Sequence, residues 1–156
     1  MNMKRKALRL KPGTFVRIPL ADGSFGYGRV LSDPYMAFYD HRTAEPSSDL
    51  DEIESKPVLF TQAVRLFGHD GWGELGHRTP QGEVAKPVIC FMQDLADFRK
   101  CTIYDSDGMQ RQATPEECIG LERAAVWDAP HIARRLLDHF MGRPNEAEIR
   151  ARVQLS

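Results

Sequence analysis

Four carboxylates lie within six residues of the sequence: Asp49, Asp51, Glu52 and Glu54. The simplest interpretation is a solvated loop or one short, exposed helical turn. The sharper interpretation is recognition, because clustered carboxylates can present the charge pattern of a phosphate backbone to a basic cleft and orient a partner during encounter. We therefore name these four acids as candidate contacts for a protein partner. Trp72 is a candidate aromatic anchor, although a core position is its favoured explanation.

Nucleophilic catalysis would need a serine or cysteine beside a histidine and an orienting group. Cys90, Cys101 and Cys118 lie among apolar or strand residues, where cysteine usually packs as a small hydrophobic side chain. A hydrolase, in which a cysteine or carboxylate would lie beside His131 or His139, stays open as a further hypothesis. No sequence motif supports it. No catalytic residue is therefore predicted.

Metal binding is not expected either. His131 and His139 are eight residues apart on one predicted helix, too far for both to bind one ion in the manner of an i, i+4 pair. The sequence contains no Cys-x-x-Cys motif. We predict no metal and no cofactor.

The formal net charge of −1 hides an uneven distribution of charge. Residues 1–12 hold five Lys and Arg and no acid, whereas residues 13–133 hold 11 bases and 19 acids, a net charge of −8. An acidic middle opposes a phosphate backbone, so nucleic acid is not the expected partner. The alternative is a small-barrel module that binds nucleic acid through its basic ends. Its candidate side chains are Lys4, Arg5, Lys6, Arg150 and Arg152.

Three features of the sequence predict where the protein is located. The longest apolar runs are far shorter than the roughly 20 residues that cross a bilayer. The basic first residues are not followed by the apolar stretch of a signal peptide. Three cysteines without close spacing are typical of reduced thiols. We expect a cytoplasmic protein without membrane contact; its oligomeric state stays open.

Alternating apolar residues and turn signals predict a β-rich chain up to about residue 112. Asp22-Gly23 favours a two-residue hairpin turn, which would place Leu20 opposite Phe25 and Ile18 opposite Tyr27 on the core side. Strands are predicted at residues 14–20, 25–31, 35–40, 57–64, 72–77, 88–92, 101–104 and 121–127.

Two glycines in the second strand, Gly26 and Gly28, share one face. Side chains are missing there either because the sheet bends sharply or because another backbone comes close, and a small, strongly curled barrel is the natural interpretation.

Helix signals appear towards the C-terminus. Residues 114–117, Thr-Pro-Glu-Glu, form a capping box that predicts a short helix ending at Gly120. Asp128 is expected to cap the one long helix, Pro130–Met141, whose apolar residues recur at four-residue spacing.

These elements predict the α+β class, with a predominantly antiparallel, strongly curled β-sheet or small barrel and a C-terminal α-helix. The absence of a long linker favours one domain over residues 1–156. Within it, residues 1–12 are a basic N-terminal segment and residues 143–156 a tail of uncertain structure.

Several of these segments resemble the immunity protein 26 family, bacterial proteins that neutralise polymorphic toxins. The resemblance rests on residues 13–20, 26–30, 38–40, Trp72 with residues 75–76, residues 113–117 and residues 120–126. It implies a non-enzymatic, cytoplasmic, immunity-type domain that binds a cognate toxin domain. Nucleases are frequent among such toxins, which agrees with the acidic middle of the chain. No site residues are carried over from the family.

Overall fold

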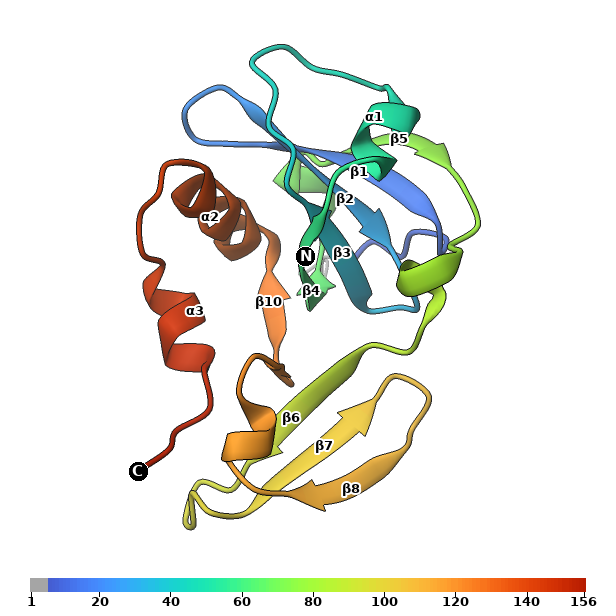
Figure 1. Ribbon diagram of the computed structural model, residues 1–156. Helices are drawn as coiled ribbons and strands as arrows, with labels where there is room; N and C mark the ends of the chain where they lie inside the picture. The colour runs from blue at the N-terminus through green and yellow to red at the C-terminus, as the bar shows by residue number, and fades with distance from the viewer. Residues whose placement is uncertain (1–5) are drawn as a thin grey trace, which may run out of the picture.

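The computed structural model describes residues 6–156, which form two β-sheets and three α-helices (Figure 1). The main sheet has the strand order β10-β4-β3-β2-β1-β5, and the small sheet has the order β8-β7-β6-β9. The strands are β1 Thr14–Pro19, β2 Phe25–Val30, β3 Tyr35–Tyr39, β4 Val58–Arg65, β5 Gly73–His77, β6 Ile89–Gln93, β7 Cys101–Asp105, β8 Gln110–Ala113, β9 Glu122–Arg123 and β10 Val126–Asp128. The helices are α1 Leu50–Glu54, α2 Ala129–Phe140 and α3 Glu146–Ala151, with single 3₁₀ turns η1 Gly68–Asp70, η2 Gly82–Ala85 and η3 Glu116–Cys118.

The hairpin of β1 and β2 forms as predicted, but its register was predicted wrongly by one residue. Ile18 pairs with Gly26, not with Tyr27. The turn holds three residues, because Leu20 N–H donates to the Ser24 carbonyl at 2.9 Å and Gly23 adopts φ +85°. A left-handed residue at the third loop position is typical of three-residue hairpins. The extra residue moves the aromatic side chains of β2 to the face opposite Ile18.

Helix α2 covers one face of the main sheet (Figure 1). A Cβ atom on Gly26 would lie 3.2 Å from Leu136 Cδ1, so the missing side chain lets α2 pack close to β2. The buried cluster on this face consists of Val16, Ile18, Leu20, Val30, Met36, Phe38, Val64, Trp127, Ile132, Leu136 and Leu137.

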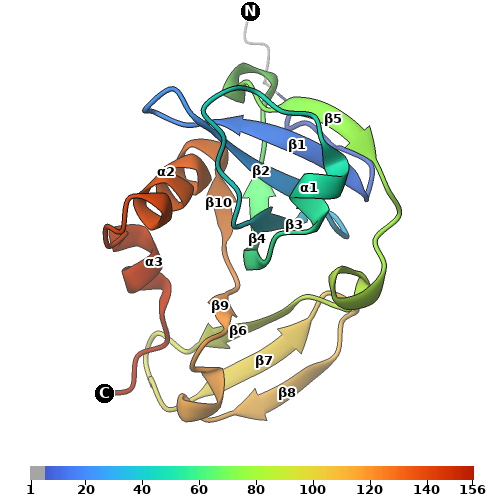
Figure 2. The same ribbon diagram turned by 45° about the horizontal axis from the view of Figure 1, so that its top comes forward.

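The opposite face of the main sheet carries a smaller apolar cluster. Helix α1 packs there, apart from α2 (Figure 2), and contributes its one buried residue, Ile53. Ile53 joins Phe15, Tyr27 and Tyr39 in a second cluster. Arg29 extends from this face of β2 and is only 2 % exposed.

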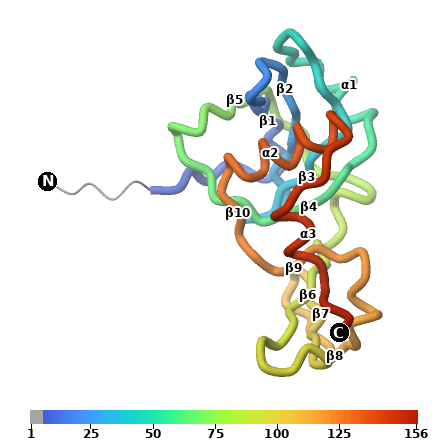
Figure 3. The backbone as a smooth tube through the Cα atoms, turned by 90° about the vertical axis from the view of Figure 1, so that its left-hand side faces the viewer, coloured from blue at the N-terminus to red at the C-terminus, as the bar shows by residue number. Residues whose placement is uncertain are grey.

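The small sheet extends from one end of the main sheet (Figure 3) and has its own cluster of buried side chains. Phe91 and Ile103 are paired neighbours on β6 and β7, and Cys101 and Cys118 pack with them. Val153 and Leu121 cover the rim of this cluster.

One short segment joins the two sheets. The predicted strand over residues 121–127 is divided: β9 pairs in parallel with β6 in the small sheet, and β10 pairs in parallel with β4 in the main sheet. The carboxylate of Glu122 accepts two hydrogen bonds from Arg135 of α2, at 2.7 and 3.2 Å. The Arg135 guanidinium also lies 3.6 Å from the centroid of the Phe60 ring. The charge of Glu122, which lies in an otherwise apolar run, is therefore paired within the chain.

The helix boundaries follow the sequence signals with two differences. Thr114 and Glu117 form the predicted capping box, with Glu117 N–H donating to Thr114 Oγ1 at 3.3 Å and Thr114 N–H donating to Glu117 Oε1 at 3.1 Å. Asp128 precedes α2 as predicted, but its side chain does not cap the helix; it pairs with Arg65 at 3.4 Å. The C-terminal tail contains α3. Asn145 caps the N-terminus of α3, because its Oδ1 atom accepts a hydrogen bond from Glu148 N–H at 2.9 Å.

The predicted α+β class, the mostly antiparallel sheets and the C-terminal helix are confirmed. In the part of the chain that the structure describes, neither sheet closes: β10 and β5 form the two edges of the main sheet. The expected barrel or strong curl is therefore not confirmed. At Gly26 the missing side chain makes room for α2 instead.

Candidate functional site

The acidic segment forms a short helix, α1. Of the two local structures expected for it, a loop or one helical turn, the helical turn is the one observed. Asp49 is its N-cap, and Asp49 Oδ1 accepts from Glu52 N–H at 3.1 Å. At the other end Ser55 Oγ donates to the Glu52 carbonyl at 2.6 Å. Ile53 anchors α1 to the sheet, and the four acidic residues of the segment are exposed on the helix.

Three of the four acids have basic neighbours. Asp51 Oδ1 lies 2.8 Å from Arg78 Nη2, and Glu54 Oε2 lies 3.2 Å from Arg29 Nη1. Glu52 Oε1 lies 3.9 Å from the ring nitrogen of His41. The Asp51 side chain nevertheless remains 87 % exposed, and about half of the Glu52 side chain is exposed. Since Asp49 caps the helix and Glu54 holds Arg29, Asp51 and Glu52 are the acids most available to a partner.

Trp72 lies elsewhere. It packs against the α2 face of the main sheet, with its ring edge-on to Phe38 at 6.0 Å between centroids. The main sheet separates it from α1, so the five predicted contact residues do not form one continuous site. The expectation that Trp72 belongs to the core is confirmed in part, because the residue is half-buried.

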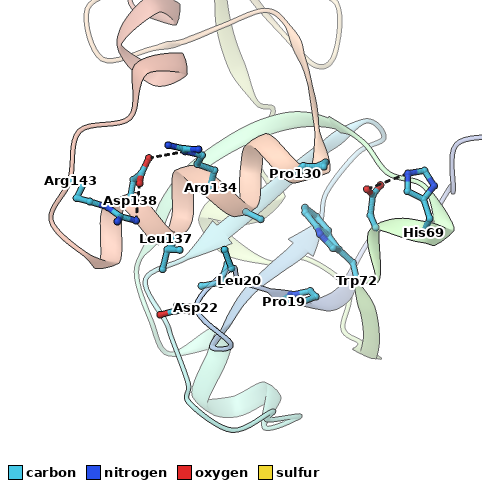
Figure 4. Close-up of a pocket in the computed structure, with 13 residues that line it drawn as sticks. Pro19, Leu20, Asp22, His69, Trp72, Pro130, Arg134, Leu137, Asp138 and Arg143 are labelled. Carbon is cyan, nitrogen blue, oxygen red and sulfur yellow. Dashed lines mark ion pairs between the residues drawn. The ribbon is translucent and has the colours of Figure 1, made fainter.

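Trp72 also lines an open groove of about 920 Å³ between α2, the β1–β2 hairpin and η1 (Figure 4). Leu20, Pro130 and Leu137 contribute apolar surface to it. On its rim the Asp138 carboxylate lies 3.2 Å from Arg143 and 3.9 Å from Arg134. The two guanidinium groups on the rim therefore share one carboxylate.

Arg29 is the residue of this region that sequence reasoning did not select. Its guanidinium lies 4.5 Å from the centroid of the Phe15 ring and donates to Glu54 and to the Arg78 carbonyl, the latter at 2.8 Å. One feature of the sequence could have identified Arg29: the alternation of residues in its strand placed it on the predicted core side. An arginine at such a position must find acceptors, because burial of an unpaired charge is costly.

The cysteines and histidines do not assemble into a nucleophilic site. All three thiols are buried. Burial raises the pKa of the Cys90 thiol and raises that of Cys118 to about 11, so both are protonated at neutral pH. His139 has a carboxylate neighbour, Asp40, at 3.3 Å, but both side chains are nearly half exposed. Among residues 6–156 no group of three His, Cys, Asp or Glu side chains could hold a metal ion.

The basic ends give little support to the nucleic-acid alternative. Lys4 and Arg5 lie outside the described residues. Arg150 lies 3.8 Å from Glu146, and Arg152 lies 3.7 Å from Glu148, both one helical turn away. The charge of α3 is thus balanced along its own surface.

No described helix has both the length and the apolar character that a membrane span requires.

Comparison with known proteins gives one match. Residues 11–102, more than half of the chain, match the family described as immunity protein 26. The matched region includes α1, Arg29 and Trp72, whereas the resembling segments at residues 113–126 lie beyond it. Neither a curated protein nor a solved structure was found to match. The chain belongs to the immunity protein 26 family, which indicates a role in immunity to a toxin.

Proposed function

We propose that this chain is a bacterial, cytoplasmic immunity protein that binds a cognate toxin domain and neutralises it by protein–protein contact, without catalysis of its own. Membership of the immunity protein 26 family is the observation that carries the proposal. Contact with the toxin would occlude or distort the toxin's active site. Residues 1–156 would act as a single domain.

The proposed contact surface is the outer side of α1. Asp51 and Glu52 are exposed there, and Asp49 and Glu54 flank them. Carboxylates at this spacing complement a basic groove of the kind that binds a phosphate backbone, so a nuclease is the class of toxin that fits best. Exposed charges act mainly on association rate and specificity, and their effect decreases with salt.

The experiment measures affinity for a cognate toxin domain, to be sought first among the products of the genes beside this one. The double variant Asp51→Lys with Glu52→Lys reverses two exposed charges and leaves both the Asp49 cap and the Glu54–Arg29 pair in place. We expect affinity to fall by about tenfold or more at low salt, and the difference to shrink as salt rises. Titration calorimetry at several salt concentrations measures both effects.

The matched control is Asp107→Lys with Glu116→Lys, which reverses two exposed acids on the small sheet and η3. Its affinity should stay within about twofold of the parent. Equal losses in both double variants would show only a general charge effect, and unchanged affinity in the α1 variant would place the interface elsewhere.

A variant of Trp72 distinguishes an interface on α1 from one in the groove beside α2. Because Trp72 lies on the other face of the main sheet, a toxin that docks on α1 does not reach it. Trp72→Phe retains an aromatic ring against Phe38, so we expect little change in affinity. A large loss in Trp72→Phe, with no loss in the α1 variant, would move the interface to the groove beside α2.

A further inference from the structure

The loop between β6 and β7 presents a leucine, Leu95, whose side chain is fully exposed. The loop around it is ordered by hydrogen bonds. The Asp94 carboxylate accepts from Ala96 N–H at 2.8 Å and from Asp97 N–H at 2.9 Å, and Asp94 N–H donates to the Lys100 carbonyl at 2.9 Å. Because these bonds already hold the loop in one conformation, docking of Leu95 on a partner would cost little further ordering of the chain.

The same loop carries one carboxylate without an ion pair. Asp97 lies 3.0 Å from Arg99 Nε, whereas Asp94 makes no ion pair within residues 6–156. The hydrogen bonds from Asp97 N–H and Ala96 N–H lower the pKa of Asp94, and the charge of Lys100 adds to this effect, so the carboxylate is ionised at neutral pH. The loop therefore presents an apolar side chain next to a negative charge.

The groove between α2, the β1–β2 hairpin and η1 has an apolar floor and a positive end (Figure 4). Leu20, Trp72 and Leu137 contribute to the floor. Arg134 and Arg143 lie at the positive end, with 81 % and 54 % of their side chains exposed. The groove can therefore seat an apolar side chain with a carboxylate beside it.

The two guanidinium groups at the positive end have unused hydrogen-bond donors. Asp138 lies 3.2 Å from Arg143 and 3.9 Å from Arg134, and it also accepts from Asn145 at 2.9 Å. Neither guanidinium donates a hydrogen bond within residues 6–156. Two positive charges face one buried negative charge, so one positive charge is left to balance. An incoming carboxylate would supply both that charge and the acceptors.

The other acids that line the groove already have partners. Asp22 is paired with Arg42. Asp70 accepts from Phe67 N–H at 2.7 Å, and its side chain is only 5 % exposed. These two acids therefore do not compensate the positive charge at the Arg134 end.

We propose that a second copy of the chain docks its β6–β7 loop in this groove, with Leu95 on the apolar floor and Asp94 beside Arg134 and Arg143. Within one molecule the loop projects from the end of the small sheet, well away from α2 (Figure 1, Figure 3), so it does not fill its own groove. The contact joins two different surfaces, so each copy can bind one neighbour through its loop and another through its groove. The inference does not depend on toxin binding, because α1 belongs to neither surface.

The test measures the mass of the full chain by sedimentation velocity over a hundredfold range of protein concentration. One loop in one groove is a small interface, so we expect weak, concentration-dependent association that decreases as salt rises. Leu95→Ser removes the apolar anchor and Arg134→Glu reverses the charge at the end of the groove. Each should weaken association about tenfold or more, and both residues are exposed, so the fold should be retained. A chain that stays monomeric at every concentration would overturn the proposal and leave the groove to a segment of another protein.

A mixing experiment distinguishes this contact from any other mode of association. Copies with Leu95→Ser keep an intact groove, and copies with Arg134→Glu keep an intact loop. An equimolar mixture should therefore form dimers through one productive contact, and no larger species, at a concentration at which each variant alone is monomeric. A mixture that stays monomeric would overturn the head-to-tail contact.

Matched controls share residue type and exposure with the two variants. Leu155→Ser removes another exposed leucine, and Arg150→Glu reverses an arginine that is also 81 % exposed and has an acid 3.8 Å away, one helical turn along. Both should leave association unchanged. Asp94→Asn retains an oxygen that can accept the hydrogen bonds of the loop but removes its charge, so it should weaken association about threefold. Equal losses in the controls and in the two variants would show general stickiness of the surface and contradict the assignment.

Discussion

The two faces of the main sheet differ in what holds them together. On the α2 face, a 12-residue helix buries Ile132 and Leu136 completely in a cluster of apolar side chains. On the α1 face, a five-residue helix buries one side chain, Ile53. Both faces also bury polar residues: Arg29 and His41 on the α1 face, and Gln62 and Arg135 on the α2 face.

The difference separates stability from recognition. The α2 face has the area and the close packing that stabilise the fold, since apolar burial is the dominant favourable contribution. The α1 face retains buried polar atoms that lack partners among residues 6–156, which costs stability, and it carries exposed carboxylates that can contact a partner.

The largest expected effect is the loss of a buried side chain under α2. Leu136→Ala should lower the free energy of unfolding by about 2–5 kcal/mol, because a cavity forms in a cluster that cannot collapse freely. Ile53→Ala removes an equally buried side chain, but the short α1 can move to fill the space, so a smaller loss is expected. Urea denaturation of both variants measures the difference. Equal losses would break the distinction between the faces.

Close packing on the α2 face predicts the next effect. A Cβ atom on Gly28 would lie 3.0 Å from the Phe38 ring and 3.1 Å from the Ala37 carbonyl oxygen. Gly28→Ala should therefore lower the free energy of unfolding by about 1–3 kcal/mol. The control is Gly73→Ala in β5, where the nearest atom would be a flexible arginine terminus at 3.6 Å. A neutral Gly28→Ala in thermal or urea unfolding would show that β2 and β3 have space to spare.

The α1 face should respond in the opposite direction. Tyr39→Phe removes a buried hydroxyl whose own proton finds no acceptor among the described residues, so we expect the free energy of unfolding to rise by up to about 1 kcal/mol. Tyr35→Phe, which removes a hydroxyl in contact with Cys90, should not raise it. Paired urea titrations of these two variants compare the phenols directly. A clear loss of stability in Tyr39→Phe would mean that its hydroxyl is satisfied in solution.

The smallest effect is a pH dependence on the same face. Burial lowers the pKa of His41, although Glu52 opposes this and Lys56 adds to it. As the pH falls below about 6.5, the unfolded chain binds a proton that the folded chain does not, so stability decreases until the lowered pKa is reached. His41→Gln should flatten this decrease in urea unfolding between about pH 7.5 and pH 5. The exposed His131→Gln is the control, and identical slopes in both variants would contradict the assignment.

Local signals predicted many of the elements well. The strands around Val16, Phe38 and Phe91 and the long helix around Leu136 lie within a few residues of their expected bounds. The capping box at Thr114 also formed, although its helix is a single 3₁₀ turn. Periodicity and capping act between residues close in sequence, which is why they can be read without a structure.

The wrong or missing predictions concern strand register, strand pairing and the last helix. The hairpin register was wrong by one residue because a three-residue turn with Gly23 in the left-handed region competes with the two-residue alternative. The strand over residues 121–127 was predicted as one, since nothing local shows that β9 and β10 pair with different sheets. The helix α3 has only six residues, which is too short for an apolar repeat to be detected in its sequence. Its apolar side chains pack against the cluster under α2.

The sequence by itself determined the class of fold, the family, and the residue types available for contact: a cluster of acids and a tryptophan. Only the tertiary structure decided that the acids and Trp72 lie on opposite faces of a sheet, and that the β6–β7 loop lies well away from the groove beside α2. The physical reason is that side-chain chemistry is a property of each residue, whereas proximity depends on register and on which face each strand presents. A shift of one residue in register reverses those faces, and packing against α1 and α2 selects among the alternatives.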